Sequence, residues 1–143
     1  MSADDKLIFL LTVVQQGVKN YVNKALAAEG VRITLAQSGV LFLLEQQDRR
    51  MMSEIGKILG IENSAMTGLI DRLEKAGFVT RISDPQDRRA LLICSTPAGL
   101  EEAQKAKAVI HRVNDEIKSG YSEHQVEVFS RVLDGLLKKV KGM

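Results

Sequence analysis

Apolar residues recur every three or four positions near both ends of the chain, which is the spacing of one face of an α-helix. The first such stripe predicts a helix over about residues 6–28, which Gly30 would end. Thr34 and Gln37 then form a capping box, in which the hydroxyl and the amide each satisfy a backbone N–H at a helix start. A strongly apolar run follows, so we expect a second, deeply buried helix over 35–46.

The middle of the chain is divided by glycines. Residues 53–59 and 63–76 have the pattern of two short helices, broken at Gly60 and stopped by Gly77. The sequence offers two residues as the N-cap of the second of these helices, Glu62 and Asn63.

A change to β-prone residues follows these helices. Residues 78–82 alternate in polarity, and residues 90–94 are β-prone again. The polar segment 83–89 lies between them, so we predict a two-stranded hairpin with a long charged tip.

The last third of the chain carries two more helical stripes. Thr96 and Pro97 supply an N-cap and a first-turn proline, and Gly120 breaks the helix that they open. Ser122 and Gln125 form a second capping box before the final helix. The apolar positions of the two predicted helices are Ala103, Ala106, Ile110, Val113 and Ile117, and then Val126, Phe129, Leu133, Leu136 and Val140.

The two central helices have the features of a helix-turn-helix. Such a motif needs a small residue where the helices cross, a glycine-like residue in the turn and apolar residues that fix the pair to the core. Gly56 suits the crossing and Gly60 the turn. The apolar positions are Ile55, Leu59, Ile61, Met66 and Leu69.

The opposite face of the second helix of this motif has mostly short side chains. Short residues let a helix enter the major groove of double-stranded DNA deeply, where hydroxyls and amides reach bases or phosphates. The alternative is an ordinary solvated helix face. The candidate groove-facing residues are Asn63, Ser64, Ala65, Thr67, Gly68 and Arg72.

The hairpin tip carries Arg88 and Arg89, directly after the helix-turn-helix pattern. Guanidinium groups suit the negative potential of a narrow minor groove, so a wing in this place would bring them beside the duplex. In the alternative interpretation, they lie on a surface loop and pair with Asp84 and Asp87. Both arrangements are compatible, because an aspartate can hold an arginine in position.

Composition narrows the class of protein further. The chain has 143 residues and a net charge of +2, which fits one unit but does not establish nucleic-acid binding. Two acidic residues precede the first apolar run and no apolar stretch reaches about 18 residues, so we expect neither export nor a membrane span. The single cysteine excludes an intrachain disulfide framework and suits a reducing compartment, with the cytoplasm as the simplest location.

Two segments together resemble the multiple antibiotic resistance regulator (MarR) family. Residues 84–90, Asp-Pro-Gln-Asp-Arg-Arg-Ala, followed by Thr96-Pro97-x-Gly99, look like the wing signature of that family. Residues 69–79 match the end of its recognition helix. Gly68 departs from the pattern, because such proteins often carry a longer polar or basic side chain there, and Ser95 stands where an apolar residue is usual.

The resemblance implies a mainly α fold with a small β-hairpin wing (α+β). It implies dimerisation helices over 6–30 and 97–143, a winged helix-turn-helix DNA-binding domain over 34–95, a recognition helix at about 63–76 and a wing at about 78–95. It also implies a homodimeric repressor of a palindromic operator, released by a small aromatic or anionic effector. Carried over by position, Asn63, Ser64, Ala65, Thr67, Gly68 and Arg72 would face the groove, and Asp87, Arg88 and Arg89 would form the wing set.

Other chemistry has little support in the sequence. Cys94 is either a redox sensor or a small buried apolar residue of a strand, and the strand setting favours the latter. His111 and His124 lack the neighbours of a zinc site, and no phosphate-binding loop or catalytic set occurs, so we expect no metal, no cofactor and no enzyme. The effector-binding residues are not predicted. A competing hypothesis is a winged-helix adaptor that binds a protein partner and never reads DNA.

Overall fold

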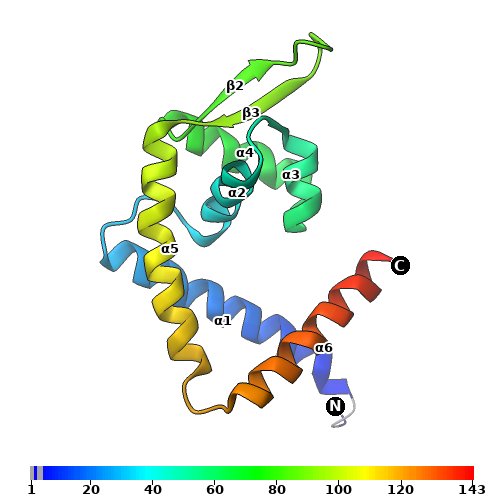
Figure 1. The fold of residues 1–143 in the computed structure, drawn as a ribbon. Helices are drawn as coiled ribbons and strands as arrows, with labels where there is room; N and C mark the ends of the chain where they lie inside the picture. The colour runs from blue at the N-terminus through cyan, green and yellow to red at the C-terminus, as the bar shows by residue number, and fades with distance from the viewer. Residues whose placement is uncertain (1, 3–4) are drawn as a thin grey trace. The chain divides into compact units, whose positions relative to one another are not determined.

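The computed structural model describes residues 2 and 5–143, and these form six helices and a small three-stranded sheet (Figure 1). The internal contacts of the chain divide it into two compact units. The first ends at Ile110, and the second runs from His111 to Met143. None of the helices in the described part of the chain is both long and apolar enough to span a membrane.

The first two helices lie where the sequence predicts them, α1 at Lys6–Ala28 and α2 at Leu35–Gln46. Gly30 ends the α1 segment in the left-handed region, with φ +74°, where a side chain would be strained. The capping box is formed in full. Gln37 N–H donates to the Thr34 hydroxyl at 3.3 Å, and Thr34 N–H donates to Gln37 Oε1 at 2.9 Å.

The helix-turn-helix consists of α3, Met52–Leu59, and α4, Asn63–Lys75. Helix α3 begins one residue earlier than predicted, and α4 ends one residue earlier. Glu62 is the N-cap of α4 and makes no side-chain capping bond, so the helix start depends on backbone geometry and packing. Gly60, with φ +70°, makes the turn between the helices.

The wing is a three-stranded antiparallel sheet in the order β1-β3-β2. Strands β2, Val79–Ser83, and β3, Leu91–Ser95, form the predicted hairpin. The sequence analysis did not predict the third strand, β1, Arg50–Met51, which pairs with β3 opposite Ile93 and Leu92. A strand of two residues has too short a pattern to show alternation, and only pairing with β3 defines it.

The core of the first unit is mainly aliphatic, as expected for a chain in which only 4% of the residues are aromatic. Leu41 and Leu44 of α2 are at most 2% exposed, so the predicted deep burial of that helix is confirmed for one face. The largest fully buried apolar side chains are Leu26, Leu41, Leu44, Ile55, Met66, Ile70, Leu73 and Ile93.

The last two helices are α5, Pro97–Lys118, and α6, Glu123–Lys141. Along α5, Ala103 and Ala106 are fully buried, whereas Ile117 is 47% exposed. No residue of α6 is buried, although its apolar stripe is as regular as that of any other helix. The stripe therefore predicts the helix correctly, while its burial is not achieved within the single chain.

Candidate nucleic-acid interface

Helix α4 is fixed to the core along one face. Met66, Ile70 and Leu73 are completely buried, which is the packing that a recognition helix needs if its other face is to remain free. Gly56 of α3 lies at the crossing, because a Cβ there would approach the Ile61 carbonyl oxygen to 2.8 Å and Met66 Cγ to 2.9 Å. The predicted role of Gly56 is thus explained by a close backbone approach.

The predicted groove-facing residues share the outer side of α4. All of them are exposed except Gly68, which is half-buried. The Thr67 hydroxyl donates to the Asn63 carbonyl oxygen at 3.0 Å, so its hydrogen is used inside the helix and its oxygen remains an acceptor. The face offers short side chains and one charge, that of Arg72.

The wing tip is shaped by its aspartates. Asp84 N–H donates to the Ala90 carbonyl oxygen at 3.0 Å, and Asp84 Oδ1 accepts from Gln86 N–H at 2.9 Å. Asp87 Oδ1 accepts from Arg89 N–H at 3.1 Å. Both carboxylates therefore hold the backbone of the turn, as aspartates commonly do.

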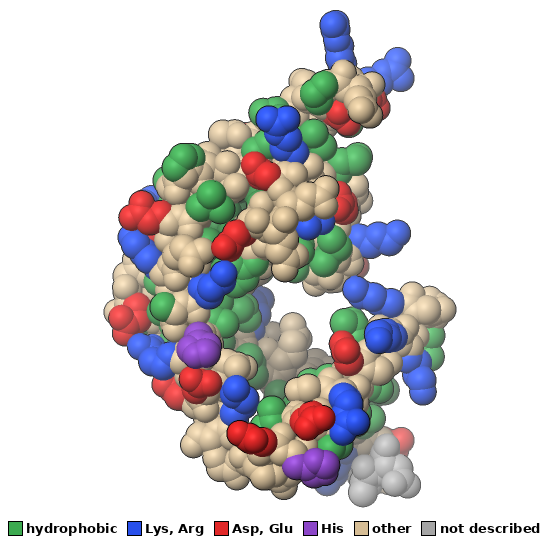
Figure 2. Space-filling view, viewed as in Figure 1, with side chains coloured by type: hydrophobic (Ala, Val, Ile, Leu, Met, Phe, Trp, Pro, Cys, Tyr) green, Lys and Arg blue, Asp and Glu red, His purple; other side chains and the backbone are tan. Residues whose placement is uncertain are grey.

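The guanidinium groups of Arg88 and Arg89 are exposed and form no ion pair with any described residue. Cations project from this tip in the space-filling view (Figure 2). The structure does not show the alternative in which both arginines are neutralised by Asp84 and Asp87. Two cations without partners are thus available to an external anion.

An ion pair that the sequence analysis missed joins the wing to α4. Arg81 of β2 donates from Nη2 to Asp71 Oδ1 at 2.6 Å and from Nη1 to Glu74 Oε1 at 3.3 Å. The bridge fixes the first wing strand against the recognition helix. The partners are seven and ten residues apart across a turn, so no local periodicity indicates the contact.

A second set of contacts that the sequence analysis missed is made by the side chain of Arg50, between α2 and α3. Its side chain is nearly buried, and Nε donates to the Leu43 and Gln47 carbonyl oxygens at 3.1 and 3.0 Å, at the end of α2. Nη1 pairs with Glu54 of α3 at 2.9 Å. A cation at a helix C-terminus satisfies free carbonyls and the helix dipole, so Arg50 connects α2 to the helix-turn-helix.

Ser95, the departure at the end of β3, is held by polar contacts. Asp48 Oδ1 accepts from Ser95 N–H at 3.0 Å and from its hydroxyl at 3.3 Å. Burial, with a further contribution from Asp48, raises the pKa of the neighbouring Cys94 thiol. A raised pKa reduces the thiolate fraction, which is typical of a small packing residue.

No group of three or more His, Cys, Asp or Glu side chains within the described residues could hold a metal ion.

A cleft of about 880 Å³ lies beside α4 in the first unit. It is lined by α1, the first turn of α2 and the turn that leads into α4. Lys19 and Arg72 are the charged residues on its walls, and Asn23 Oδ1 there accepts the Leu35 N–H at 2.8 Å. The cleft therefore has a positive lining without a carboxylate.

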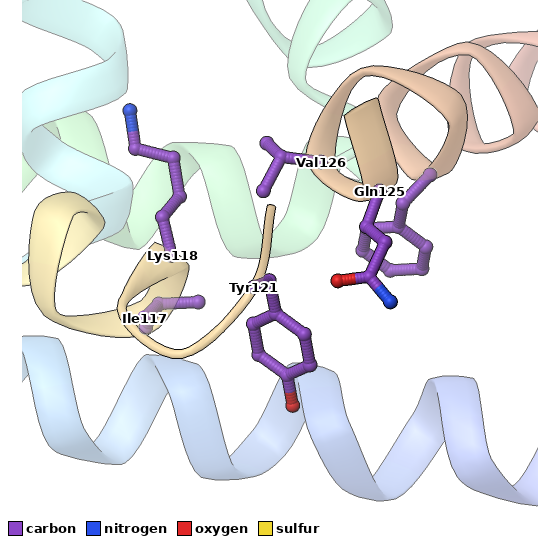
Figure 3. A pocket seen from close by; sticks show the side chains of 6 residues that line it. Ile117, Lys118, Tyr121, Gln125 and Val126 are labelled. Atoms are coloured by element: carbon purple, nitrogen blue, oxygen red, sulfur yellow. The ribbon is translucent and has the colours of Figure 1, made fainter. Parts of the chain in front are cut away.

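A smaller pocket of about 400 Å³ lies in the second unit, at the turn between α5 and α6. Ile117, Tyr121 and Val126 lie around it (Figure 3). Tyr121 is 66% exposed and Phe129, which also lines the pocket, is 58% exposed. The wall of this pocket is mainly apolar, and Lys118 and Gln125 are its charged and amide side chains.

A helix-turn-helix followed by a wing defines the class of winged helix DNA-binding proteins. The sequence profile of the MarR family matches residues 33–91, from the end of the loop before α2 to the start of β3. The transcriptional regulator YfiV of Bacillus subtilis is 32% identical over 115 residues, which cover 75% of this chain and 71% of YfiV. The chain belongs to the MarR family of transcriptional regulators.

Two further relatives extend the comparison. YcgE, an HTH-type transcriptional regulator of B. subtilis, is 32% identical over 63% of this chain, which spans 59% of the length of YcgE. The structure of the repressor CouR of Rhodococcus jostii RHA1 was solved with p-coumaroyl-CoA bound. That structure is 30% identical to this chain in sequence, with a TM-score of 0.79, and the match covers 95% of this chain and 94% of the CouR chain. CouR bound to a 23-mer DNA duplex has a TM-score of 0.84 at 26% identity, over 92% of each chain.

Proposed function

We propose that this protein is a homodimeric, ligand-responsive repressor that binds a palindromic operator in double-stranded DNA. The observation that carries the proposal is the free outer face of α4 together with a wing tip that carries two unpaired arginines. In the proposal, α4 chooses the sequence, while Arg88 and Arg89 of the wing set, with Asp87 shaping the turn, contact the backbone and the adjacent minor groove. In the same proposal the protein acts in the cytoplasm and works by binding and not by catalysis. This part rests on its relatives, which are named as transcriptional regulators.

Two unpartnered apolar surfaces support the dimer. Phe9 and Val13 of α1 are 57% and 67% exposed, and Phe129 and Val140 of α6 are 58% and 64% exposed. Surfaces of this kind mark protein interaction sites. A second copy of the chain is the occupant we propose, because a two-fold dimer presents two recognition helices to two half-sites about 10 base pairs apart.

The cleft beside α4 is the proposed effector site. Its cation Lys19 suits a small anion, and the cleft is bounded both by α1 and by the helix-turn-helix. CouR, which was solved with DNA, was also solved with p-coumaroyl-CoA. A ligand between these elements would favour dimers with another spacing of the two recognition helices, and such dimers bind the operator less well.

The test is a binding measurement with the full-length protein on the DNA upstream of its own gene and on random DNA, at one salt concentration. We expect a preference of at least about 1,000-fold for the upstream site, which is the lower end for specific regulators. A panel of small aromatic acids added to the same assay tests the effector. Equal affinity for both DNAs would overturn sequence-specific binding.

Double substitution of Arg88 and Arg89 by alanine tests the wing. We expect weaker binding on all sequences and a salt dependence whose slope falls by about one unit for each phosphate that the variant no longer neutralises. Lys24→Ala is the control, because Lys24 is an exposed cation of α1, outside the winged helix. If the double variant binds DNA like the wild type, the wing proposal is overturned. If the wild type binds no DNA and the double substitution leaves the binding of a protein partner unchanged, the adaptor hypothesis replaces the proposed function.

A further inference from the structure

Gly68 has no structural reason to be a glycine. It lies in the middle of α4, where glycine weakens a helix, and its backbone is not in the left-handed region. A Cβ at this position would meet no atom closer than Arg72 Nη1 at 3.6 Å, which is an ordinary contact. Gly56 differs, since a Cβ there would approach a backbone oxygen to 2.8 Å. Packing inside the chain explains Gly56 and leaves Gly68 unexplained.

The space over Gly68 is occupied by Arg72. Long side chains of a helix lean toward its N-terminus, over the residue four positions earlier. The two terminal nitrogens of Arg72 lie 3.6 and 3.9 Å from where the Gly68 Cβ would be. The guanidinium is exposed and forms no ion pair or hydrogen bond with another described residue, so its donors are free.

We propose that the Arg72 guanidinium, lying across Gly68, reads a guanine in each half-site of the operator. This inference rests on the proposed function. A guanidinium donates to O6 and N7 of guanine in the major groove, which is the commonest specific contact of its kind. The missing side chain at Gly68 leaves the guanidinium room on the outer face of the helix.

The neighbouring side chains on α4 support the assignment of guanine recognition to Arg72. Thr67 has committed its hydroxyl hydrogen to the Asn63 carbonyl oxygen, and Ala65 has no polar group. Arg72 is the charged member of the outer-face set and the one with a planar fork of donors. The other members are short enough to let the fork reach the base edges.

The experiment first selects binding sites from a random duplex pool with the full-length wild-type protein. Every position of the selected site is then changed in turn, and affinities are measured at one salt concentration for the wild type, Arg72→Ala, Arg72→Lys and Lys75→Ala. Lys75 is the matched control, because it is an exposed cation of the same helix. Melting curves and the oligomeric state check that each variant is folded.

We expect the wild type to require guanine at one position per half-site. Arg72→Ala and Arg72→Lys should each lose about 10-fold or more of the discrimination at that position and keep the rest, because neither has the fork. Lys75→Ala should keep every base preference. If Arg72→Ala weakens binding to all sequences equally, Arg72 contacts phosphate and the inference is overturned. If the wild type selects no site, the proposed function itself fails.

Two substitutions of Gly68 test the geometry. Gly68→Ala should keep the guanine preference, because its Cβ makes an ordinary contact with the guanidinium. Gly68→Leu should displace the guanidinium and lose the preference in a protein that still melts cooperatively. A folded Gly68→Leu variant with an unchanged preference for guanine would overturn the inference.

Discussion

Helices α4 and α6 carry apolar stripes of the same kind, and the two stripes meet opposite fates in the folded chain. In α4, Ile70 and Leu73 are completely buried. In α6, Phe129 is 58% and Leu137 is 51% exposed, and no residue of the helix is buried. The stripe thus indicates which side of a helix avoids water, but not whether the same chain supplies the partner.

The difference separates two kinds of stability in this protein. The helix-turn-helix and wing obtain theirs from contacts within one chain, whereas the faces of α6 and of the first half of α1 remain to be covered. A perturbation of the first kind should therefore act on folding. A perturbation of the second kind should act on assembly and should depend on protein concentration.

The largest expected effect is on folding. Ile70→Ala removes a fully buried side chain and should lower the free energy of unfolding by about 2–5 kcal/mol. Ile58→Ala is the matched control, because Ile58 of α3 is 43% exposed and its replacement should change stability by about 0.5 kcal/mol or less. Urea unfolding at one protein concentration measures both. Equal destabilisation by the two variants would contradict the assignment of α4 to the core.

The next effect is on assembly. Leu137→Glu places a charge in the exposed apolar stripe of α6, and we expect it to raise the dimer dissociation constant by at least about 30-fold, corresponding to about 2 kcal/mol. Lys139→Glu introduces the same residue at an exposed polar position of the helix and should leave the dimer intact. Sedimentation equilibrium provides the measurement. A dimer unaffected by Leu137→Glu would show that α6 is not part of its interface.

Alanine substitutions at two glycines of the helix-turn-helix should change the stability of the protein in opposite directions. Gly56→Ala places a Cβ 2.8 Å from the Ile61 carbonyl oxygen and should cost about 1–3 kcal/mol. Gly68→Ala has room and should stabilise the protein by about 0.4–1 kcal/mol, because it restricts the unfolded chain. Thermal unfolding of both variants distinguishes the sites. Destabilisation by Gly68→Ala would mean that the helix needs a glycine there for its own packing.

The smallest effect is expected for the bridge between wing and helix. Arg81→Met removes the ion pairs with Asp71 and Glu74, which are partly exposed, so stability should fall by about 1 kcal/mol or less and less still at high salt. Lys75→Met is the control, because Lys75 is an exposed cation of α4 in the same unit. Urea unfolding at low and high salt measures both variants. A decrease of several kcal/mol for Arg81→Met would place Arg81 among the residues that hold the fold.

Much of the architecture follows from local patterns. Gly30 correctly predicts the end of the first helix, and the capping box at Thr34 correctly predicts the start of the second. Both signals act within one helical turn. Strand β1, the Arg50 contacts and the Arg81 bridge were not predicted. Each depends on a partner brought close by the fold, and a sequence pattern over a few residues does not contain that information.

The candidate site divides in the same way. The outer face of α4 follows from helical spacing, so the positions of the six groove-facing candidates could be predicted. The free state of Arg88 and Arg89 could not, because Asp84 and Asp87 are placed to pair with them and instead hold the turn backbone. The position of the Arg72 guanidinium over Gly68 is likewise visible only in the folded helix, because spacing alone does not fix a long side chain.

The joint between wing and α5 bears on how motion would pass through the domain. Thr96 donates its hydroxyl to the Gly77 carbonyl oxygen at 2.6 Å and its N–H to the Phe78 carbonyl oxygen at 3.1 Å. A Cβ on Gly99 would overlap the Phe78 carbonyl oxygen, so the start of α5 touches backbone directly. Close backbone contacts of this kind leave little room for the start of α5 to move independently of residues 77 and 78. We expect a small tilt of the first turns of α5 to be delivered to the wing undiminished.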